Sequence, residues 1–420
     1  MNNIKEKVNY CLGCKVKPCK KGCPLQNDIT EIIRYMKNEE YEEAYKIATK
    51  TSVLQSVCGR ICPHMSQCEG SCIRGIKSTP VSIGEIEAYL GDIAIKNQYN
   101  MCEIEKIKNN VKIAVIGSGP AGLTCAAYLA RSGANVTIFE KYDKLGGILR
   151  HGIPEFRLSK DILDESIKKI IDLGIKVECN KELGRNLQID TLKQEFDAIY
   201  LAIGANISWK MNIPGEDLNG VFGGNELLEK ADHPDYKGKT VIISGGGNVA
   251  MDCARTVKKL GASSVKVVYR RAQEQMPAEK KEIEDAKNEG IEFLFQNNIV
   301  KIIGDTSVKG IECVKTKLIQ KEGETRLSPV NIEESNYKID ADYVIMAIGS
   351  TIEKEVIDKI GVSVNKKGYV DINEDYETSI ENVFAGGDLA GTKATVAWAA
   401  RSGRDAAEKI LKKLSWCVNE

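Results

Sequence analysis

The sequence has 420 residues, of which 42% are apolar and 28% are charged, as in ordinary soluble globular proteins. Its length exceeds what one hydrophobic core usually supports and predicts two or three domains. Lysine plus arginine and aspartate plus glutamate balance at 59 each, so we expect neither nucleic-acid binding nor attachment to a membrane surface. The first residues are polar, and no apolar run approaches the roughly 18–20 residues that cross a bilayer. We therefore expect a cytoplasmic protein.

Cysteines are concentrated in residues 1–109, among amphipathic patterns that predict helices at Asp28–Lys37 and Glu40–Thr49. Cytosolic thiols are kept reduced, so this concentration indicates metal binding rather than disulfides. A Cys-Pro pair that ends a cysteine run is typical of ferredoxins with two clusters. Two structural zinc sites are the alternative, but iron–sulfur clusters suit the redox sites predicted below. The two runs are Cys11-x2-Cys14-x4-Cys19-x3-Cys23-Pro24 and Cys58-x3-Cys62-Pro63-x4-Cys68-x3-Cys72.

A dinucleotide-binding turn is predicted between the apolar strand Lys112–Ile116 and a helix at Leu123–Ala130. Its first glycine permits a tight bend, its second lets the backbone approach a pyrophosphate, and its third lets the helix pack against the strand. The next strand, Asn135–Phe139, ends at Glu140, whose carboxylate can accept hydrogen bonds from a ribose. An acid at this place suits FAD. The turn consists of Gly117, Ser118, Gly119, Pro120, Ala121 and Gly122.

The same pattern starts again at Lys239–Ile243, but here the following strand, Val265–Tyr269, ends at Arg270 and Arg271. An acid would repel a 2′-phosphate, whereas arginines bind one through charge-assisted hydrogen bonds. Such bonds are worth roughly 1.5–3 kcal/mol each, which favours NADPH over NADH. The alternative is that these are ordinary exposed arginines at a strand end. The second turn contains Gly245, Gly247, Asn248, Val249 and Ala250.

Alternating strands and helices predict two doubly wound parallel sheets, an α/β fold with two Rossmann-like domains. The late segment Val383–Asp388 is expected to return to the first sheet, so that the second nucleotide domain is an insertion in the first. Two nucleotide sites imply hydride transfer from nicotinamide to flavin, which needs no protein acid or base. No catalytic side chain is therefore expected. The predicted domains are a helical iron–sulfur domain at 1–109, an FAD-binding domain at 110–236 and 341–420, and an NADPH-binding domain at 237–340.

Together these motifs resemble the small (beta) subunit of glutamate synthase over essentially the whole chain. Its relatives include the flavin/iron–sulfur subunit of NADH-dependent ferredoxin:NADP oxidoreductase and the N-terminal half of dihydropyrimidine dehydrogenase. The resemblance implies a glutathione-reductase-like arrangement of the FAD and NADPH domains behind the iron–sulfur domain. It is carried by the first cysteine run and by Val57–Pro63, Gln67–Cys72, Ser82–Glu87, Gly152–Leu158, Met276–Ala278 and Gly386–Asp388.

The resemblance also implies two [4Fe–4S] clusters whose ligands cross between the two cysteine runs. One cluster would be bound by Cys11, Cys14, Cys19 and Cys72, and the other by Cys23, Cys62, Cys68 and Glu87. Cys58 would then be a spare thiol, and the alternative for Glu87 is a solvated helix acid. The implied NADPH contacts are the second turn with Arg270 and Arg271. The implied flavin contacts are the first turn with Glu140, Gly147, Asp388, Thr395 and Val396.

The resulting hypothesis is an electron-input subunit of a hetero-oligomer, which passes hydride from NADPH to FAD and single electrons through the clusters to a redox partner protein. The partner would resemble the glutamate synthase large subunit or be a ferredoxin-linked subunit. One alternative is a subunit of an electron-bifurcating NAD(P)H:ferredoxin oxidoreductase, and another is a zinc-containing nucleotide sensor. A self-contained small-molecule reductase is disfavoured because it would need a paired redox disulfide, and the remaining cysteines are isolated.

Overall fold

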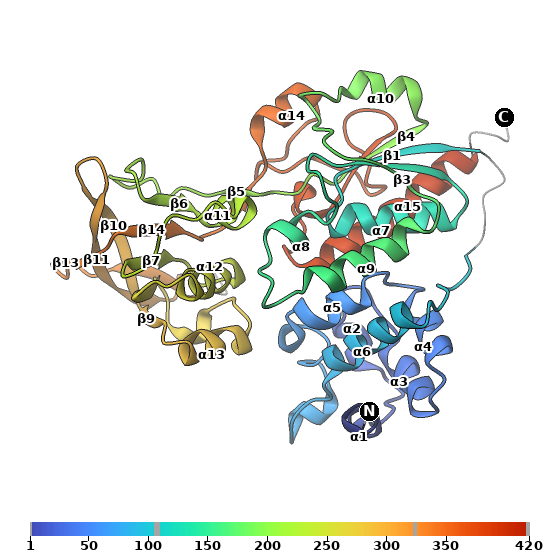
Figure 1. Ribbon diagram of the computed structural model, residues 1–420, viewed down its shortest axis with the longest axis horizontal. Helices are drawn as coiled ribbons and strands as arrows, with labels where there is room; N and C mark the ends of the chain where they lie inside the picture. The colour runs from blue at the N-terminus through green and yellow to red at the C-terminus, as the bar shows by residue number, and fades with distance from the viewer. Residues whose placement is uncertain (1, 105–109, 322–325, 417–420) are drawn as a thin grey trace. The chain divides into compact units, whose positions relative to one another are not determined.

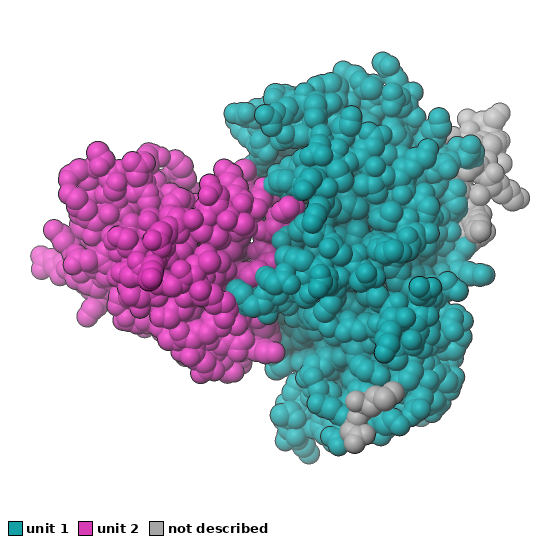
Figure 2. Space-filling model, in the orientation of Figure 1, with its two compact units in different colours: residues 1–150, 155–205, 352–420 teal, residues 151–154, 206–351 magenta. Residues whose placement is uncertain are grey.

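The computed structural model describes residues 2–104, 110–321 and 326–416, which form two compact units (Figure 1). Unit 1 comprises residues 1–150, 155–205 and 352–420, and unit 2 comprises residues 151–154 and 206–351 (Figure 2). Unit 1 therefore contains the cysteine runs and the first glycine turn, and unit 2 contains the second glycine turn. In the described ranges, no helix has the length and apolar character needed to cross a membrane.

The cysteine-rich region folds into short helices around an apolar core that includes Ile33, Met36 and Leu90. The Asp28 carboxylate accepts a hydrogen bond from the Glu31 N–H and so caps one of these helices. The helices expected near residues 28–37 and 40–49 are confirmed as α3 and α4. The elements are α1 (Asn2–Tyr10), α2 (Pro18–Gly22), α3 (Ile29–Lys37), α4 (Tyr41–Ala48), α5 (Gln55–Ile61), η1 (His64–Ser66), η2 (Ile73–Ile76) and α6 (Ile83–Lys96).

The first parallel sheet has the strand order β16-β4-β1-β2-β3. Because β16 comes from the end of the chain and pairs with β4, the last segment returns to this sheet, as expected. The strands are β1 (Lys112–Ile116), β2 (Asn135–Phe139), β3 (Lys176–Glu178), β4 (Ala198–Leu201) and β16 (Val383–Ala385). The other elements are α7 (Pro120–Arg131), α8 (Ile148–His151), α9 (Lys160–Ile171), α10 (Ile189–Glu195), α14 (Lys354–Ile360), η4 (Gly387–Ala390) and α15 (Val396–Trp416).

Unit 2 contains a second parallel sheet, of order β6-β14-β7-β8-β9, and an antiparallel sheet built on β11. The parallel strands are β6 (Val221–Gly223), β7 (Thr240–Ser244), β8 (Ser264–Tyr269), β9 (Glu292–Phe295) and β14 (Tyr343–Met346). The antiparallel strands are β10 (Asn297–Gly304), β11 (Val308–Ile319), β12 (Ser328–Asn331) and β13 (Tyr337–Asp340). The helices are α11 (Gly224–Lys230), α12 (Asn248–Lys259), η3 (Gln273–Gln275) and α13 (Lys280–Asn288), and β5 (Ile207–Ser208) pairs with β15 (Ser350–Thr351).

The boundaries of unit 2 differ from the expected domain at 237–340. The strands β6 and β14 lie outside that range, yet β14 pairs with both β6 and β7 and so completes the second sheet. The iron–sulfur region also shares unit 1 with the first nucleotide sheet instead of forming a compact unit of its own.

The long helix α15 packs directly against α7, the helix that follows the first glycine turn (Figure 1). A Cβ added at Gly403 of α15 would lie 2.1 Å from the Ala121 carbonyl oxygen of α7. Real side chains do not approach backbone so closely, so glycine at this position sets the distance between the two helices.

We predict that Gly403→Val lowers the thermal unfolding midpoint of the protein by several degrees. Overpacking of this kind costs about 1–3 kcal/mol. The exposed Glu408 lies on the same helix, so Glu408→Val is the matched control for the lower helix propensity of valine. Differential scanning calorimetry on anaerobically purified protein measures both variants. Equal midpoints for the two variants would contradict the close packing of α15 on α7.

Candidate cofactor and cluster sites

The first group of predicted cluster ligands comes together in the helical region of unit 1. Cys11, Cys14, Cys19 and Cys72 all line one narrow pocket, although Cys72 belongs to the second cysteine run. The rest of the pocket wall is largely apolar and includes Ile29 from α3. We call these four residues the outer set, because all four are only partly buried.

The thiol of Cys19 shows how closely the outer set converges. Burial raises its pKa, the Thr30 hydroxyl 3.8 Å from its sulfur lowers it, and negative charge on Cys11 and Cys72 raises it further. Deprotonation of the Cys19 thiol is therefore unfavourable unless a cation compensates the negative charge. A metal centre supplies such compensation and binds the thiolate forms.

The second group consists of Cys23, Cys62, Cys68 and Glu87, which we call the inner set. Burial raises the pKa of Cys23 to about 12, with a further rise from the Glu87 charge. Burial and the charges of Glu87 and Cys23 hold the pKa of Cys68 well above its ordinary range. Cys23 comes from the first run and the other two cysteines from the second, so the structure brings together residues of both runs in each set.

Glu87 is not a solvated helix acid. Burial raises the pKa of its carboxyl group to about 8, while a hydrogen bond from the Asn27 amide at 3.1 Å lowers it. The side-chain amide oxygen of Asn27 (Oδ1) in turn accepts a hydrogen bond from the Thr51 hydroxyl. The predicted spare thiol, Cys58, is buried against the inner set, where its hydrogen bond is the largest cause of the raised pKa of Cys62.

The side chains of the two sets are not gathered around a single point. Within residues 2–104, 110–321 and 326–416, no three His, Cys, Asp or Glu side chains converge closely enough to hold one metal ion. A zinc ion requires such convergence, since all its ligands bind the same atom. In a [4Fe–4S] cluster each ligand binds a different iron, so wider groups of thiolates fit it.

The first glycine turn has the shape expected of a pyrophosphate cradle. Gly117 has φ +98°, and a Cβ there would lie 2.5 Å from the Ala202 carbonyl oxygen. A Cβ at Gly122 would lie 1.9 Å from the Gly117 oxygen, whereas one at Gly119 would meet no atom within 4 Å. The space beside Gly119 is therefore open, and the first turn of α7 contains no acid to repel a phosphate.

The other predicted flavin contacts surround this turn. Glu140 is buried at the end of β2 and accepts hydrogen bonds from the N–H groups of Ser118 and Tyr142, at 3.0 and 3.1 Å. Gly147 packs against the backbone of Gly119. Burial raises the pKa of Asp388 in η4, and its carboxylate accepts a hydrogen bond from Thr392 at 3.1 Å. Thr395 and Val396 mark the start of α15, where the Thr395 hydroxyl accepts a hydrogen bond from the Trp398 N–H.

The second glycine turn repeats this geometry in unit 2. Gly245 has φ +143°, and a Cβ there would lie 2.2 Å from the Ala347 oxygen. Beside Gly247 the nearest atom is Cγ of Pro277, at 3.9 Å, so this space is open as well. The Asn248 side chain accepts a hydrogen bond from the Glu279 N–H and fixes the start of α12; Val249 and Ala250 form the rest of its first turn.

A third arginine joins the two that follow β8. Arg270 is exposed, and Arg271 donates a hydrogen bond to the Leu327 carbonyl at 3.2 Å. The neighbouring Arg326 donates to the Gln275 carbonyl at 3.0 Å and contacts the Tyr269 hydroxyl. Sequence reasoning missed Arg326 because it is distant in sequence, and only the pairing of β11 with β12 brings it to this strand end.

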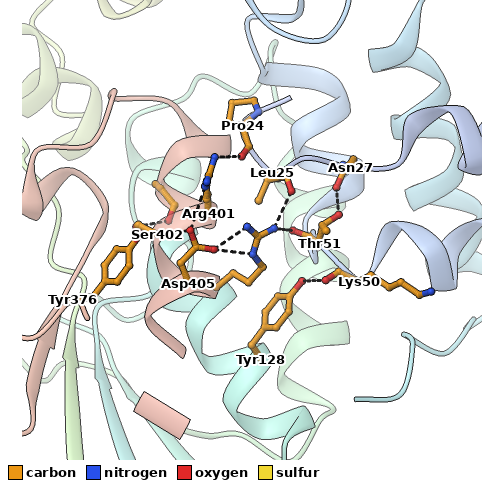
Figure 3. Close-up of polar contacts among 12 residues, drawn as sticks. Pro24, Leu25, Asn27, Lys50, Thr51, Tyr128, Tyr376, Arg401, Ser402 and Asp405 are labelled. Atoms are coloured by element: carbon orange, nitrogen blue, oxygen red, sulfur yellow. Dashed lines mark hydrogen bonds and ion pairs between the residues drawn. The ribbon is translucent and has the colours of Figure 1, made fainter. Parts of the chain in front are cut away.

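The loop that follows Cys23 is joined to α15 by a network of charged hydrogen bonds, which Figure 3 shows. Arg401 donates to the Pro24 carbonyl at 3.1 Å, directly after Cys23. Arg404 donates to the Leu25 carbonyl at 2.8 Å and to the Thr51 carbonyl at 3.3 Å. Sequence reasoning also missed these arginines, which carry no motif of their own.

A pocket of ≈ 400 Å³ is lined both by the loop around Cys23 of the inner set and by the first turn of α15. Cys23, Gln67, Thr395 and Trp398 are among its lining residues, and the Gln67 amide donates a hydrogen bond to the Thr395 hydroxyl at 3.4 Å. Its volume is in the range of small-molecule sites. One residue predicted for the flavin, Thr395, and one predicted for the inner cluster, Cys23, thus line the same pocket.

Comparisons with known proteins identify the families that the two regions of the chain match. Residues 111–403 match the model of the pyridine nucleotide-disulphide oxidoreductases, and residues 1–99 match that of dihydropyrimidine dehydrogenase domain II with its 4Fe–4S cluster. The chain is 34% identical to the glutamate synthase (NADPH) small chain of Halomonas elongata, over 97% of this chain and 90% of the relative. It is also 34% identical to the NADP(+)-dependent formate dehydrogenase subunit beta of Moorella thermoacetica, over 94% of this chain and 59% of that one.

Among solved structures, FprA of Mycobacterium tuberculosis in complex with NADPH has the same fold, with a TM-score of 0.65 at 19% identity. The match covers 74% of this chain and 86% of FprA. The chain thus belongs to the pyridine nucleotide-disulphide oxidoreductase family and, as a relative of the glutamate synthase small chains, is an NADPH-dependent flavin and iron–sulfur oxidoreductase.

Proposed function

We propose that this protein is the electron-input subunit of a larger enzyme: it takes hydride from NADPH onto FAD and delivers single electrons through two [4Fe–4S] clusters to a partner protein. The observation that carries the proposal is the assembly of two separate cysteine sets, with the inner one beside the start of α15. A metal-binding domain without redox activity would not need a cysteine set beside the predicted flavin contacts.

The outer set, Cys11, Cys14, Cys19 and Cys72, would hold one cluster, and the inner set, Cys23, Cys62, Cys68 and Glu87, the other. The pKa directions support this assignment, since the pKa values of Cys19, Cys23 and Cys68 are raised by burial and, further, by charges of other members of their own sets. Asn27 and Thr51 would orient Glu87 as a ligand, as outer-shell partners do in other metal sites. Cys58 would support the cluster without binding it.

The chain's own residues bind and orient the nucleotides. The open backbone beside Gly119 and the first turn of α7 would receive the FAD pyrophosphate, with Glu140 accepting hydrogen bonds from the ribose. Gly147, Asp388, Thr395 and Val396 would hold the rest of the flavin. The second turn would receive the NADPH pyrophosphate, and the arginines after β8 its 2′-phosphate. Hydride and electron transfer are chemistry of the bound groups, so no general acid or base is assigned.

The names of two relatives indicate what kind of partner this protein would have. One is a small chain of glutamate synthase and the other a beta subunit of a formate dehydrogenase, so both belong to assemblies with further subunits. We propose that this chain likewise works in a hetero-oligomer, with a partner similar to the glutamate synthase large subunit or another redox protein.

Anaerobic mixing with NADPH tests the proposal. We expect NADPH to bleach the visible absorbance of the flavin in protein that contains about eight iron atoms per chain, as two [4Fe–4S] clusters require. In the control Gly247→Val, a side chain fills the open space of the second turn, so NADPH should no longer bleach the flavin while dithionite still does. Failure of NADPH to bleach the wild-type flavin, or two zinc ions per chain in place of iron, would refute the proposal.

The arginines at the end of β8 should determine nucleotide preference. We expect Arg270→Gln and Arg326→Gln each to raise the Kd for NADPH about tenfold or more, because each loses a charge-assisted bond worth roughly 1.5–3 kcal/mol. The Kd for NADH should be unchanged, since NADH has no 2′-phosphate. Fluorescence titration with both nucleotides gives the two constants. An equal loss for NADH and NADPH would show that these arginines support the loop rather than select the nucleotide.

A further inference from the structure

The pocket that is lined by the loop around Cys23 and by the first turn of α15 has a basic wall. Lys21, Lys393 and Arg401 contribute to this wall, together with the side chain of Gln67, which is 8% exposed. Among the described residues that line the pocket, none is an aspartate, a glutamate or a histidine. We call this cavity of ≈ 400 Å³ the basic pocket.

The basic pocket leads away from the nucleotide sites. Thr395, Trp398 and Arg401 line it at intervals of three residues, so they follow one side of α15 from its start. At about 1.5 Å per residue they extend over about 9 Å along the helix. Within the described part of the chain, Thr395 is the one predicted flavin contact in the lining, and neither glycine turn contributes to it. The basic pocket is therefore a cavity distinct from the two pyrophosphate cradles.

Three contacts join the walls of the basic pocket. Arg401 donates a hydrogen bond to the Pro24 carbonyl at 3.1 Å (Figure 3), and Gln67 donates one to the Thr395 hydroxyl at 3.4 Å. At the end of α2, a Cβ added at Gly22 would lie 2.6 Å from the Gln67 carbonyl oxygen, so these two segments touch. The pocket is therefore formed by segments that hold one another in place.

Two of the three cations in the wall have no counter-charge. Arg401 forms an ion pair with Asp405 at 3.2 Å. Lys21 and Lys393 are exposed and form no ion pair with any described residue; the Lys393 ammonium lies 4.6 Å from the centre of the Trp398 ring. Two unpaired ammonium groups at one pocket favour a ligand that carries two negative charges.

We propose that the basic pocket binds a small organic phosphate monoester, with Lys21 and Lys393 as the counter-charges of its phosphate group. Such a group carries about −1.5 to −2 charges at pH 7, which matches two ammonium groups. Lysine binds phosphate as a point charge, whereas a carboxylate is matched best by the planar fork of a free arginine. Pro24, Pro63 and Trp398 offer apolar surface to the organic part, and the volume is that of a small-molecule site.

The residues of the basic pocket are suited to binding rather than to conversion of the ligand. Its lining contains one thiol, Cys23, which the proposed function assigns to the inner cluster. General acid–base catalysis usually relies on histidine, aspartate or glutamate, and the described lining contains none of these. We therefore assign the pocket as an effector site, in addition to the two nucleotide sites.

Phenyl phosphate serves as the probe. Isothermal titration calorimetry is done anaerobically on the holoprotein with saturating NADP⁺, so that both glycine turns are occupied by nucleotides. We expect one site per chain, with a Kd for phenyl phosphate on the order of tenfold below that for phenyl sulfate, which has a similar shape and one charge fewer. Inorganic phosphate, which has no organic part, should also bind more weakly. Equal affinity for phenyl phosphate and phenyl sulfate would overturn the preference for two charges.

Removal of the unpaired charges locates the site. Lys21→Gln/Lys393→Gln should raise the Kd for phenyl phosphate about tenfold or more, because two charge-assisted contacts are lost. The matched control is Lys96→Gln/Lys193→Gln, which removes the charges of two exposed lysines elsewhere in unit 1 and should leave the Kd unchanged.

A second variant keeps both lysines and adds a negative charge. Gln26 is exposed and lines the basic pocket, so Gln26→Glu should weaken phenyl phosphate binding by repulsion. Gln98 is the matched control, because it is also an exposed glutamine of unit 1 with a left-handed backbone, at φ +54° against +57° for Gln26. Gln98→Glu should leave the Kd unchanged. Bleaching of the flavin by NADPH should be the same in all variants and shows that they are folded.

The outcomes separate this inference from the proposed function. Equal Kd values for phenyl phosphate in the pocket variants and their controls, or no binding to the wild-type protein, would overturn the effector site alone. Failure of NADPH to bleach the wild-type flavin would refute the proposed function and leave the calorimetric result standing. Binding of a synthetic oligoglutamate peptide in place of phenyl phosphate would assign the pocket to an acidic protein segment and also overturn the inference.

Discussion

The inner set depends on how the loop after Cys23 is held. The carbonyl groups of Pro24 and Leu25 would be costly to bury without partners, and two guanidinium groups of α15 supply them, at 3.1 and 2.8 Å. Hydrogen bonds from charged donors are roughly twice as strong as neutral ones. Asp405 accepts from Arg404 at 2.8 Å and balances its charge. Because α15 also begins at the predicted flavin contacts, one helix fixes the spacing between the inner set and the flavin site.

The cysteines of the two sets differ in how deeply they are buried in unit 1. Cys62 and Cys68 of the inner set are buried, whereas Cys23 and the four cysteines of the outer set are half-buried. Burial of the Glu87 carboxyl group favours its protonated form, and a metal centre bound there would replace the proton.

Motifs in the sequence predicted those parts of the fold that depend on residues close together in the chain. The two glycine turns, the strands beside them and the helices α3 and α4 follow from the spacing of neighbouring residues, and the resemblance to a family added the crossed cysteine sets. Features that depend on contacts between residues far apart in the sequence were not predicted. Arg326 reaches the nucleotide site only through strand pairing, and Arg401 reaches Pro24 only through the packing of α15. The predicted boundaries of the NADPH-binding domain, at residues 236 and 340, differ from those of unit 2. The reason is that β6 and β14, which lie outside the predicted domain, complete the second sheet.

The central claim is that two clusters lie next to each other, because Cys19 and Cys23 are neighbours in one run and Cys68 and Cys72 in the other, yet serve different sets. Electron paramagnetic resonance of the dithionite-reduced protein tests it most directly. The account predicts about two unpaired spins per chain, with a spectrum broadened by magnetic interaction between the two centres. A single spin per chain, or two spins that show no interaction, would contradict it.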